Sequence, residues 1–278
     1  MNTLTTDCLE IIERLPAGAK LQLPDVAWDE YEHLLSQMEM FPGHRLSYDR
    51  GRLDIMSPKR DQEAYKFFIG SIVGLLAEEQ QMDIEPSGTA TLRRKKLEIG
   101  AEPDESFYIQ NAARVVDHLE TNLESDPPPD LVIEIDSTSE SLQKFKIYAA
   151  LGVPEIWRYD GRQAHFYALA GEGYEKIQNS IAFPVFAATA LTRYLEQRKT
   201  EGHSKTLRAF RQMLRAYYFL KAHTPRSLSP AAVIPYHRGT CRRKNRSRKS
   251  RPSGSFSSTR SRTSSARSSR RWGGGASP

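Results

Sequence analysis

Asp130-Leu131-Val132-Ile133-Glu134-Ile135-Asp136 is the stretch that decides the fold. Its four apolar residues are typical of a buried strand, and the period of two along a strand places Asp130, Glu134 and Asp136 on one face. Carboxylates in a core are costly unless they pair with a cation or bind a metal ion. The alternative is that these acids lie at the strand ends, where solvent satisfies them. The stretch therefore predicts a core strand and a candidate metal site.

The next segment predicts a helix that carries a lysine. Ser137-Thr138-Ser139-Glu140 has the spacing of a capping box, apolar residues follow at helical spacing, and Gly152 offers a C-terminal stop. Because helical side chains lean toward the N-terminus of their helix, Lys144 can reach back to Glu134. An exposed pair between Glu140 and Lys144, four residues apart, is an equally good interpretation. The spacing alone leaves both arrangements open.

A second acidic stretch, Glu102-Pro103-Asp104-Glu105, can add carboxylates to the same site. Together with Glu134 and Lys144 it can surround one metal ion, which is a nuclease-like arrangement. The two cysteines, Cys8 and Cys241, lie near opposite ends of the chain and form neither a disulfide framework nor a cysteine-rich zinc site. Any metal should therefore be held by oxygen ligands.

Three blocks of sequence carry a resemblance to a known family. The blocks are LEIGAEPDESFYIQNAARV, DPPPDLVIEIDSTSESLQKFKIYAALGVPEIWRYDG and AFPVF. They resemble the Uma-two family of restriction endonucleases, which has the PD-(D/E)XK nuclease fold, and the resemblance spans residues 21–195. It implies an α/β fold with a mixed central sheet flanked by helices and with the site at one edge of that sheet.

The resemblance also implies roles for individual residues. Asp104 matches the aspartate of the first half-motif, Glu134 the acidic residue of the second half, and Lys144 its lysine. In the simplest form of the motif the lysine stands two residues after the glutamate, but this chain has Asp136 there. Its lysine has moved to the helix, as is usual in this family. Asp130 could support the site indirectly or simply begin its strand.

A further acidic residue, Glu63, falls where the family commonly carries one on its first core helix. Many relatives have a histidine just before it, whereas this chain has Gln62, which weakens any proton-transfer role at that position. Glu63 could equally be an N-terminal helix acid that complements the helix dipole. The following residues, 64–81, have the amphipathic pattern of a helix.

These assignments imply Mg²⁺-dependent hydrolysis of DNA phosphodiester bonds, with Mn²⁺ as a possible substitute. Asp104 and Glu134 would hold the metal, Lys144 would orient or activate the attacking water, and Glu63 would complete the catalytic set. Cleavage of both DNA strands would need a homodimer. The alternative is a catalytically weak or inactive nuclease-fold module that binds DNA or a protein partner.

Charge is distributed unevenly along the 278 residues. From residue 221 onward the chain has 15 Lys or Arg and no Asp or Glu, which leaves 25 basic and 34 acidic residues before that point. The Arg/Ser-rich end is predicted to be disordered, and it could either neutralise nucleic-acid phosphates or be a passive extension. We expect an N-terminal extension (1–20), the nuclease-like domain (21–195), a helical extension (196–222) and the basic tail (223–278).

Weaker local patterns complete the prediction. Hairpins are predicted around Asp49-Arg50-Gly51 and around Asp160-Gly161, with His165 in a structural role, and the C-terminal helices are predicted to break near Gly202. A hydrophobic content of 38% supports a globular core, and no apolar run is long enough to span a membrane. The N-terminus lacks a signal-peptide pattern, so a cytoplasmic location is expected.

Overall fold

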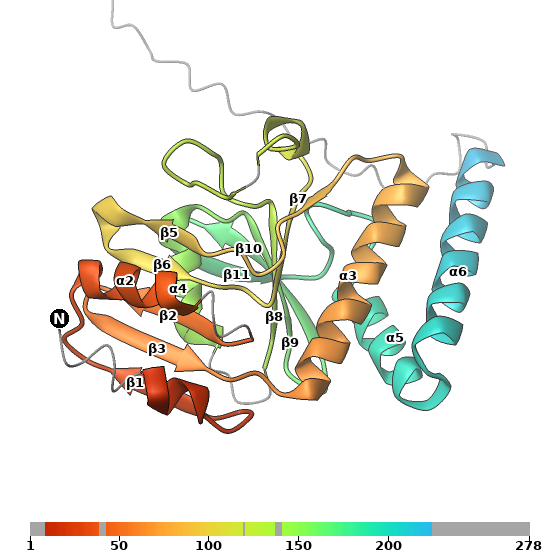
Figure 1. Ribbon diagram of the computed structural model, residues 1–278. Helices are drawn as coiled ribbons and strands as arrows, with labels where there is room; N and C mark the ends of the chain where they lie inside the picture. Colours follow the sequence, from red (N-terminus) through yellow and green to blue (C-terminus); the bar gives the residue numbers. More distant parts are fainter. Residues whose placement is uncertain (1–8, 39–42, 119, 137–140, 224–278) are drawn as a thin grey trace, which may run out of the picture. The chain divides into compact units, whose positions relative to one another are not determined.

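The computed structural model describes residues 9–38, 43–118, 120–136 and 141–223. These residues form a five-stranded and a six-stranded sheet with helices packed against them (Figure 1). The predicted mixed sheet flanked by helices is confirmed, whereas the separate five-stranded sheet was not predicted. The predicted capping box at residues 137–140 and the basic tail from 224 onward lie outside the described residues.

The five-stranded sheet is antiparallel, with the order β1-β3-β2-β6-β5. Its strands are β1 (Lys20–Leu23), β2 (Arg45–Asp49), β3 (Arg52–Met56), β5 (Leu92–Arg94) and β6 (Ile99–Ala101). The predicted β2–β3 hairpin is confirmed, and its turn residues Arg50 and Gly51 both have positive φ, as a tight right-twisted hairpin requires. Helix α2 (Trp28–Met38) packs on this sheet, where Tyr31 stacks on Tyr48 at 4.7 Å between ring centroids.

The six-stranded sheet is mixed, with the order β11-β10-β9-β8-β7-β4. Its strands are β4 (Glu85–Pro86), β7 (Glu105–Tyr108), β8 (Leu131–Ile135), β9 (Glu155–Tyr159), β10 (Ala164–Ala170) and β11 (Gly173–Ile177). The predicted strand β8 is buried at all five positions. It pairs in parallel with β9, and the crossover that a parallel pair requires contains helix α4 (Ser141–Leu151).

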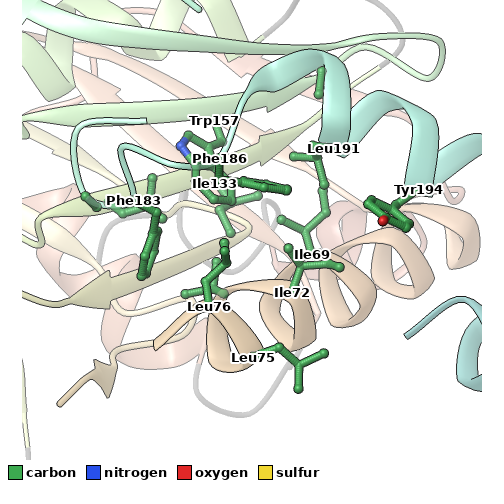
Figure 2. Packing of buried hydrophobic residues seen from close by; sticks show 14 of the residues in the cluster. Ile69, Ile72, Leu75, Leu76, Ile133, Trp157, Phe183, Phe186, Leu191 and Tyr194 are labelled. Carbon is green, nitrogen blue, oxygen red and sulfur yellow. The ribbon is translucent and has the colours of Figure 1, made fainter. Parts of the chain in front are cut away.

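The alternation of side chains along β8 and β9 builds a core on each face of this sheet. Ile133 and Trp157 belong to the core formed with α3 (Arg60–Gln80), α5 (Ala188–Glu201) and α6 (His203–His223). Figure 2 shows the side chains of this core, among them Ile69 and Ile72 of α3 and Leu191 of α5. Val132 and Ile156 instead pack with α4. Strand β8 is thus fixed from both sides, which gives the residues at its end a rigid support.

Helices α5 and α6 meet at Gly202, where the break was predicted. Phe210 of α6 is fully buried in the same core as α3, and Arg211 and Arg215 form ion pairs of 3.0 and 2.8 Å with Glu78 and Glu79. Two basic residues of α6 therefore help to hold α6 against α3. Two short 3₁₀ helices, η1 (Lys95–Leu97) and η2 (Ala112–Arg114), lie in connections. None of the helices in the described part of the chain is long and apolar enough to cross a membrane.

Candidate active site

The pairing of β7 with β8 brings two acidic residues together. Glu105 of β7 lies opposite Ile133 of β8, so one step further along this antiparallel register Asp104 comes opposite Glu134. The main-chain N–H of Ile135 donates a hydrogen bond of 2.7 Å to Asp104 Oδ2. Both carboxylates are buried, with 2% of each residue exposed. The two acidic stretches of the sequence therefore meet at one point of the mixed sheet.

Lys144 reaches this point from α4. Its Nζ donates to Glu134 Oε1 at 3.0 Å and Oε2 at 3.1 Å, and to the main-chain oxygen of Glu102 at 2.9 Å. Of the two arrangements that the spacing left open, the structure has the one in which the lysine reaches back to the strand. Tyr148 also donates from its hydroxyl to Glu134 Oε1, at 2.5 Å. The sequence analysis missed this contact, although Tyr148 follows Lys144 by one helical turn and so faces the same way.

Burial and charge together set the protonation of this cluster. Burial raises the pKa of Glu134 to about 7, against the attraction of Lys144 and with the added repulsion of Asp104. Burial also raises the pKa of Asp104. For Lys144, burial lowers the pKa, but attraction by Glu134 and Asp104 outweighs this and leaves it above its ordinary value. The amine is therefore a cation at neutral pH, beside two buried carboxylates that repel each other.

Glu63 reaches the cluster through an arginine that the sequence analysis missed. Arg45 Nη2 donates to Glu63 Oε1 at 3.0 Å, and Arg45 Nε lies 3.9 Å from Asp104 Oδ1. Lys66 Nζ lies 3.6 Å from the other oxygen of Glu63. The side chain of Glu63 is 47% exposed, whereas that of Arg45 is only 7% exposed. Glu63 thus lies at the solvent side of the cluster, and Arg45 links it to Asp104.

Gln62 contacts the main chain of the mixed sheet. Its Nε2 donates to the main-chain oxygen of Ile135 at 2.8 Å, while its Oε1 accepts from the N–H of Lys59 at 2.6 Å. Gln62 therefore ties the start of α3 to the end of β8.

The other two acids of the strand have structural partners. Asp130 accepts hydrogen bonds from the N–H groups of Ile109 and Asn111 and from the side-chain amide of Asn111, at 2.7 to 3.0 Å. It fixes the loop that follows β7. Asp136 pairs with Arg158 at 2.9 and 3.1 Å and accepts from the hydroxyl and the N–H of Ser141 at the start of α4. Asp136 thus supports the helix that supplies Lys144.

We expect Asp136→Asn to lower the free energy of unfolding by about 2 kcal/mol, because it weakens two charged hydrogen bonds to the buried Arg158. Urea unfolding at neutral pH measures this loss. Asp49→Asn is the matched control, since Asp49 pairs at 3.4 Å with a 70% exposed Arg50 and should change stability by under about 1 kcal/mol. Equal losses in the two variants would contradict the structural role of Asp136.

The carboxylate oxygens of Asp104 and Glu134 are the kind of ligand that a hard divalent cation prefers. Mg²⁺ prefers oxygen ligands and is commonly held by one or two carboxylates, with water and substrate phosphates completing its coordination. Within the described residues, no group of three or more His, Cys, Asp or Glu is arranged to hold a metal ion, so Asp104 and Glu134 would be a minimal ligand pair. The raised pKa of both carboxyl groups is the electrostatic signature of a site that a cation would stabilise.

Comparison with known proteins gives one family match. The model of the Uma2 family, described as putative restriction endonuclease, matches residues 28–193. No curated protein matches the chain. One solved structure that is similar is a crystal structure of a putative nuclease belonging to DUF820 from Anabaena variabilis, with 16% identity and a TM-score of 0.43. The similarity covers 61% of this chain and 99% of that chain.

Proposed function

The chain belongs to the Uma2 family of putative restriction endonucleases, and from this premise we propose that it hydrolyses DNA phosphodiester bonds with the help of Mg²⁺. The observation that carries the proposal is the buried cluster of Asp104, Glu134 and Lys144. A fully structural cluster would be expected to match each acid with its own cation. Here Lys144 pairs with Glu134, whereas among the described residues Asp104 has no cation closer than Arg45 Nε, at 3.9 Å.

Each residue has a role that follows from its surroundings. Asp104 and Glu134 would hold Mg²⁺, or Mn²⁺ in its place, with water in the remaining positions. The bound ion would polarise the phosphate and stabilise the charge that develops on it. Because Lys144 is protonated, it cannot take a proton, but it could donate a hydrogen bond to the attacking water or to a phosphate oxygen once a bound ion takes over the oxygens of Glu134.

Glu63 is proposed as the acid that completes the site. It is the most exposed of the four candidate residues, and its oxygens contact Arg45 and Lys66. An exposed carboxylate at the mouth of the cluster can exchange protons with solvent, which suits a group that receives the proton of the attacking water.

The competing function is an inactive accessory module, and the charge distribution favours it. Residues 1–220 have nine more acidic than basic residues, and an acidic surface repels nucleic-acid phosphates. The two functions differ in one respect that can be measured. The enzyme cuts DNA when a divalent ion is supplied, and the module binds its partner without cutting.

We expect the full-length protein to convert supercoiled plasmid to nicked circles at millimolar Mg²⁺, and to be inactive in EDTA. Gel electrophoresis over a titration of Mg²⁺ and of Mn²⁺ measures this directly. Linear product formed at the same time as nicked circles would indicate two sites acting together, as in a homodimer. DNA binding without cleavage at every concentration of either metal would instead support the accessory module.

A further inference from the structure

We propose that Arg45 is a substrate-binding residue, whose buried guanidinium binds a phosphate oxygen of nucleic acid next to Asp104 and Glu134. This inference rests on the proposed function and extends it, because Arg45 lies on β2 of the five-stranded sheet while the acids belong to the mixed sheet. One substrate phosphate would then be held between the two sheets.

The hydrogen bonds of Arg45 leave one donor without an acceptor. Its Nη1 donates to the main-chain oxygen of His44 at 3.1 Å, and its Nη2 donates to Glu63 at 3.0 Å. Its Nε is buried and has no hydrogen-bond partner among the described residues, and the nearest oxygen of Asp104 is 3.9 Å away. A buried N–H of a charged group that points toward a carboxylate cluster needs an oxygen acceptor. A phosphate oxygen meets that need and matches the charge of the guanidinium.

The surroundings place this donor at the candidate active site. Arg45 lines a cavity of about 30 Å³ together with Glu134 and Lys144. Another cation of this cavity, Lys20, is already paired with Asp54 at 3.1 Å. Lys144 is likewise engaged by both oxygens of Glu134. Among the cations that line this cavity, Arg45 is the one with a buried nitrogen that has no acceptor in the described residues, and this nitrogen can serve an incoming anion.

Arg45 also lines a second, larger groove. This groove, of about 910 Å³, is lined by Arg45 and Arg93 but also by five carboxylates, those of Glu32, Glu85, Glu102, Glu120 and Asp126. Such a lining repels phosphates. The smaller cavity has three carboxylates balanced by three Lys or Arg side chains, so we assign the phosphate to the side of Arg45 that faces Glu134 and Lys144.

A purely structural role is the competing explanation, because Arg45 also offsets the charges of Asp104 and Glu63. The two roles differ in how DNA binding responds to salt. Each phosphate contact made by a cation adds about 0.9 to the slope of log affinity against log salt concentration, whereas a structural cation adds nothing.

The test measures binding of a fluorescent 20-base-pair duplex by anisotropy, in EDTA, over a series of salt concentrations. Arg45→Met should weaken binding by about 10- to 100-fold at low salt and reduce the slope by about one. Arg45→Lys keeps the charge but not the planar fork, so it should keep the slope and bind more weakly than the wild type. Arg50→Met is the control, since it removes an exposed arginine at the turn of the same hairpin and should change neither quantity.

A wild-type slope and affinity in a folded Arg45→Met would overturn the inference. If Arg45→Met does not fold, Arg45→Lys decides, and wild-type affinity in that variant overturns it as well. Failure here is distinguishable from failure of the proposed function. A wild type that cuts plasmid while the Arg45 variants bind normally is still a nuclease, whereas a wild type that binds through Arg45 without cutting is not.

Discussion

Glu134→Gln should lose nearly all Mg²⁺-dependent cleavage, with a fall in rate of at least about 10³-fold, the upper range for removal of one electrostatic group. The substitution keeps the shape of the side chain, and its oxygen can still accept from Tyr148. It removes one of the two carboxylates that we propose as metal ligands, so Mg²⁺ affinity should fall together with activity. Isothermal titration calorimetry with Mn²⁺ measures the affinity, and plasmid cleavage measures the rate.

The matched control for this change is Glu155→Gln. Glu155 is also a buried glutamate, on the neighbouring strand β9, but it accepts hydrogen bonds from Trp157, Ile181 and Ala182. Its replacement should lower stability and leave metal affinity unchanged. Glu134→Gln should lower metal affinity and cost little stability, because burial raises the pKa of Glu134 to about 7 and its carboxyl group is therefore partly neutral near pH 7. Full metal affinity in Glu134→Gln would exclude Glu134 as a ligand.

The elements that the sequence predicted best are those whose pattern is local. An apolar strand with acids and a following helix with a lysine are visible as β8 and α4, and the contact between Glu134 and Lys144 follows from helix geometry. The pairing of Asp104 with Glu134 is different, since 29 residues separate them in the sequence. It followed only from the family resemblance, because no local pattern gives the register of β7 on β8.

What the sequence analysis missed depends on contacts between distant segments. Arg45 reads as an ordinary exposed charge at the start of a hairpin strand, and only the approach of the five-stranded sheet to β8 makes it a buried neighbour of Asp104. Asp136 seemed to share the face of Glu134, and its use depends on Arg158, which is 22 residues away. Such long-range charge pairs carry no periodic signal in a single sequence.

The sequence also could not predict how far along the chain the residues of the core extend. The family resemblance ends near residue 195, and the family model at residue 193, yet Phe210 and Leu214 of α6 are buried in the core shared with α3 and β8. The sequence predicted a helical extension there but could not show which surface its apolar residues cover. The helix pairs Arg211 with Glu78 and Arg215 with Glu79 along α3, which explains why its basic residues recur at helical spacing.

Lys144→Met should lower the cleavage rate by at least about 10²-fold while leaving metal binding intact or tighter. Methionine is close to lysine in side-chain length but carries no charge. It suits this position because the Lys144 side chain is only 11% exposed. Removing a cation 3.0 Å from Glu134 makes the ligand pair more negative, so the site should attract a divalent ion at least as strongly as before. The rate falls because the ammonium group that we propose as the hydrogen-bond donor to the attacking water is lost.

Lys146→Met is the control for this last change, because Lys146 lies on the same helix, is exposed and carries the same charge. It should keep the wild-type rate and the wild-type metal affinity. Metal affinity should fall in Glu134→Gln but stay the same or rise in Lys144→Met. This difference would identify Glu134 as a metal ligand and Lys144 as a residue that does not bind the metal. Loss of folding could not produce it, because unfolding would lower the metal affinity of both variants. If instead Lys144→Met cleaved DNA at the wild-type rate, the lysine would serve only to neutralise Glu134, and the chemistry would have to be assigned to other residues.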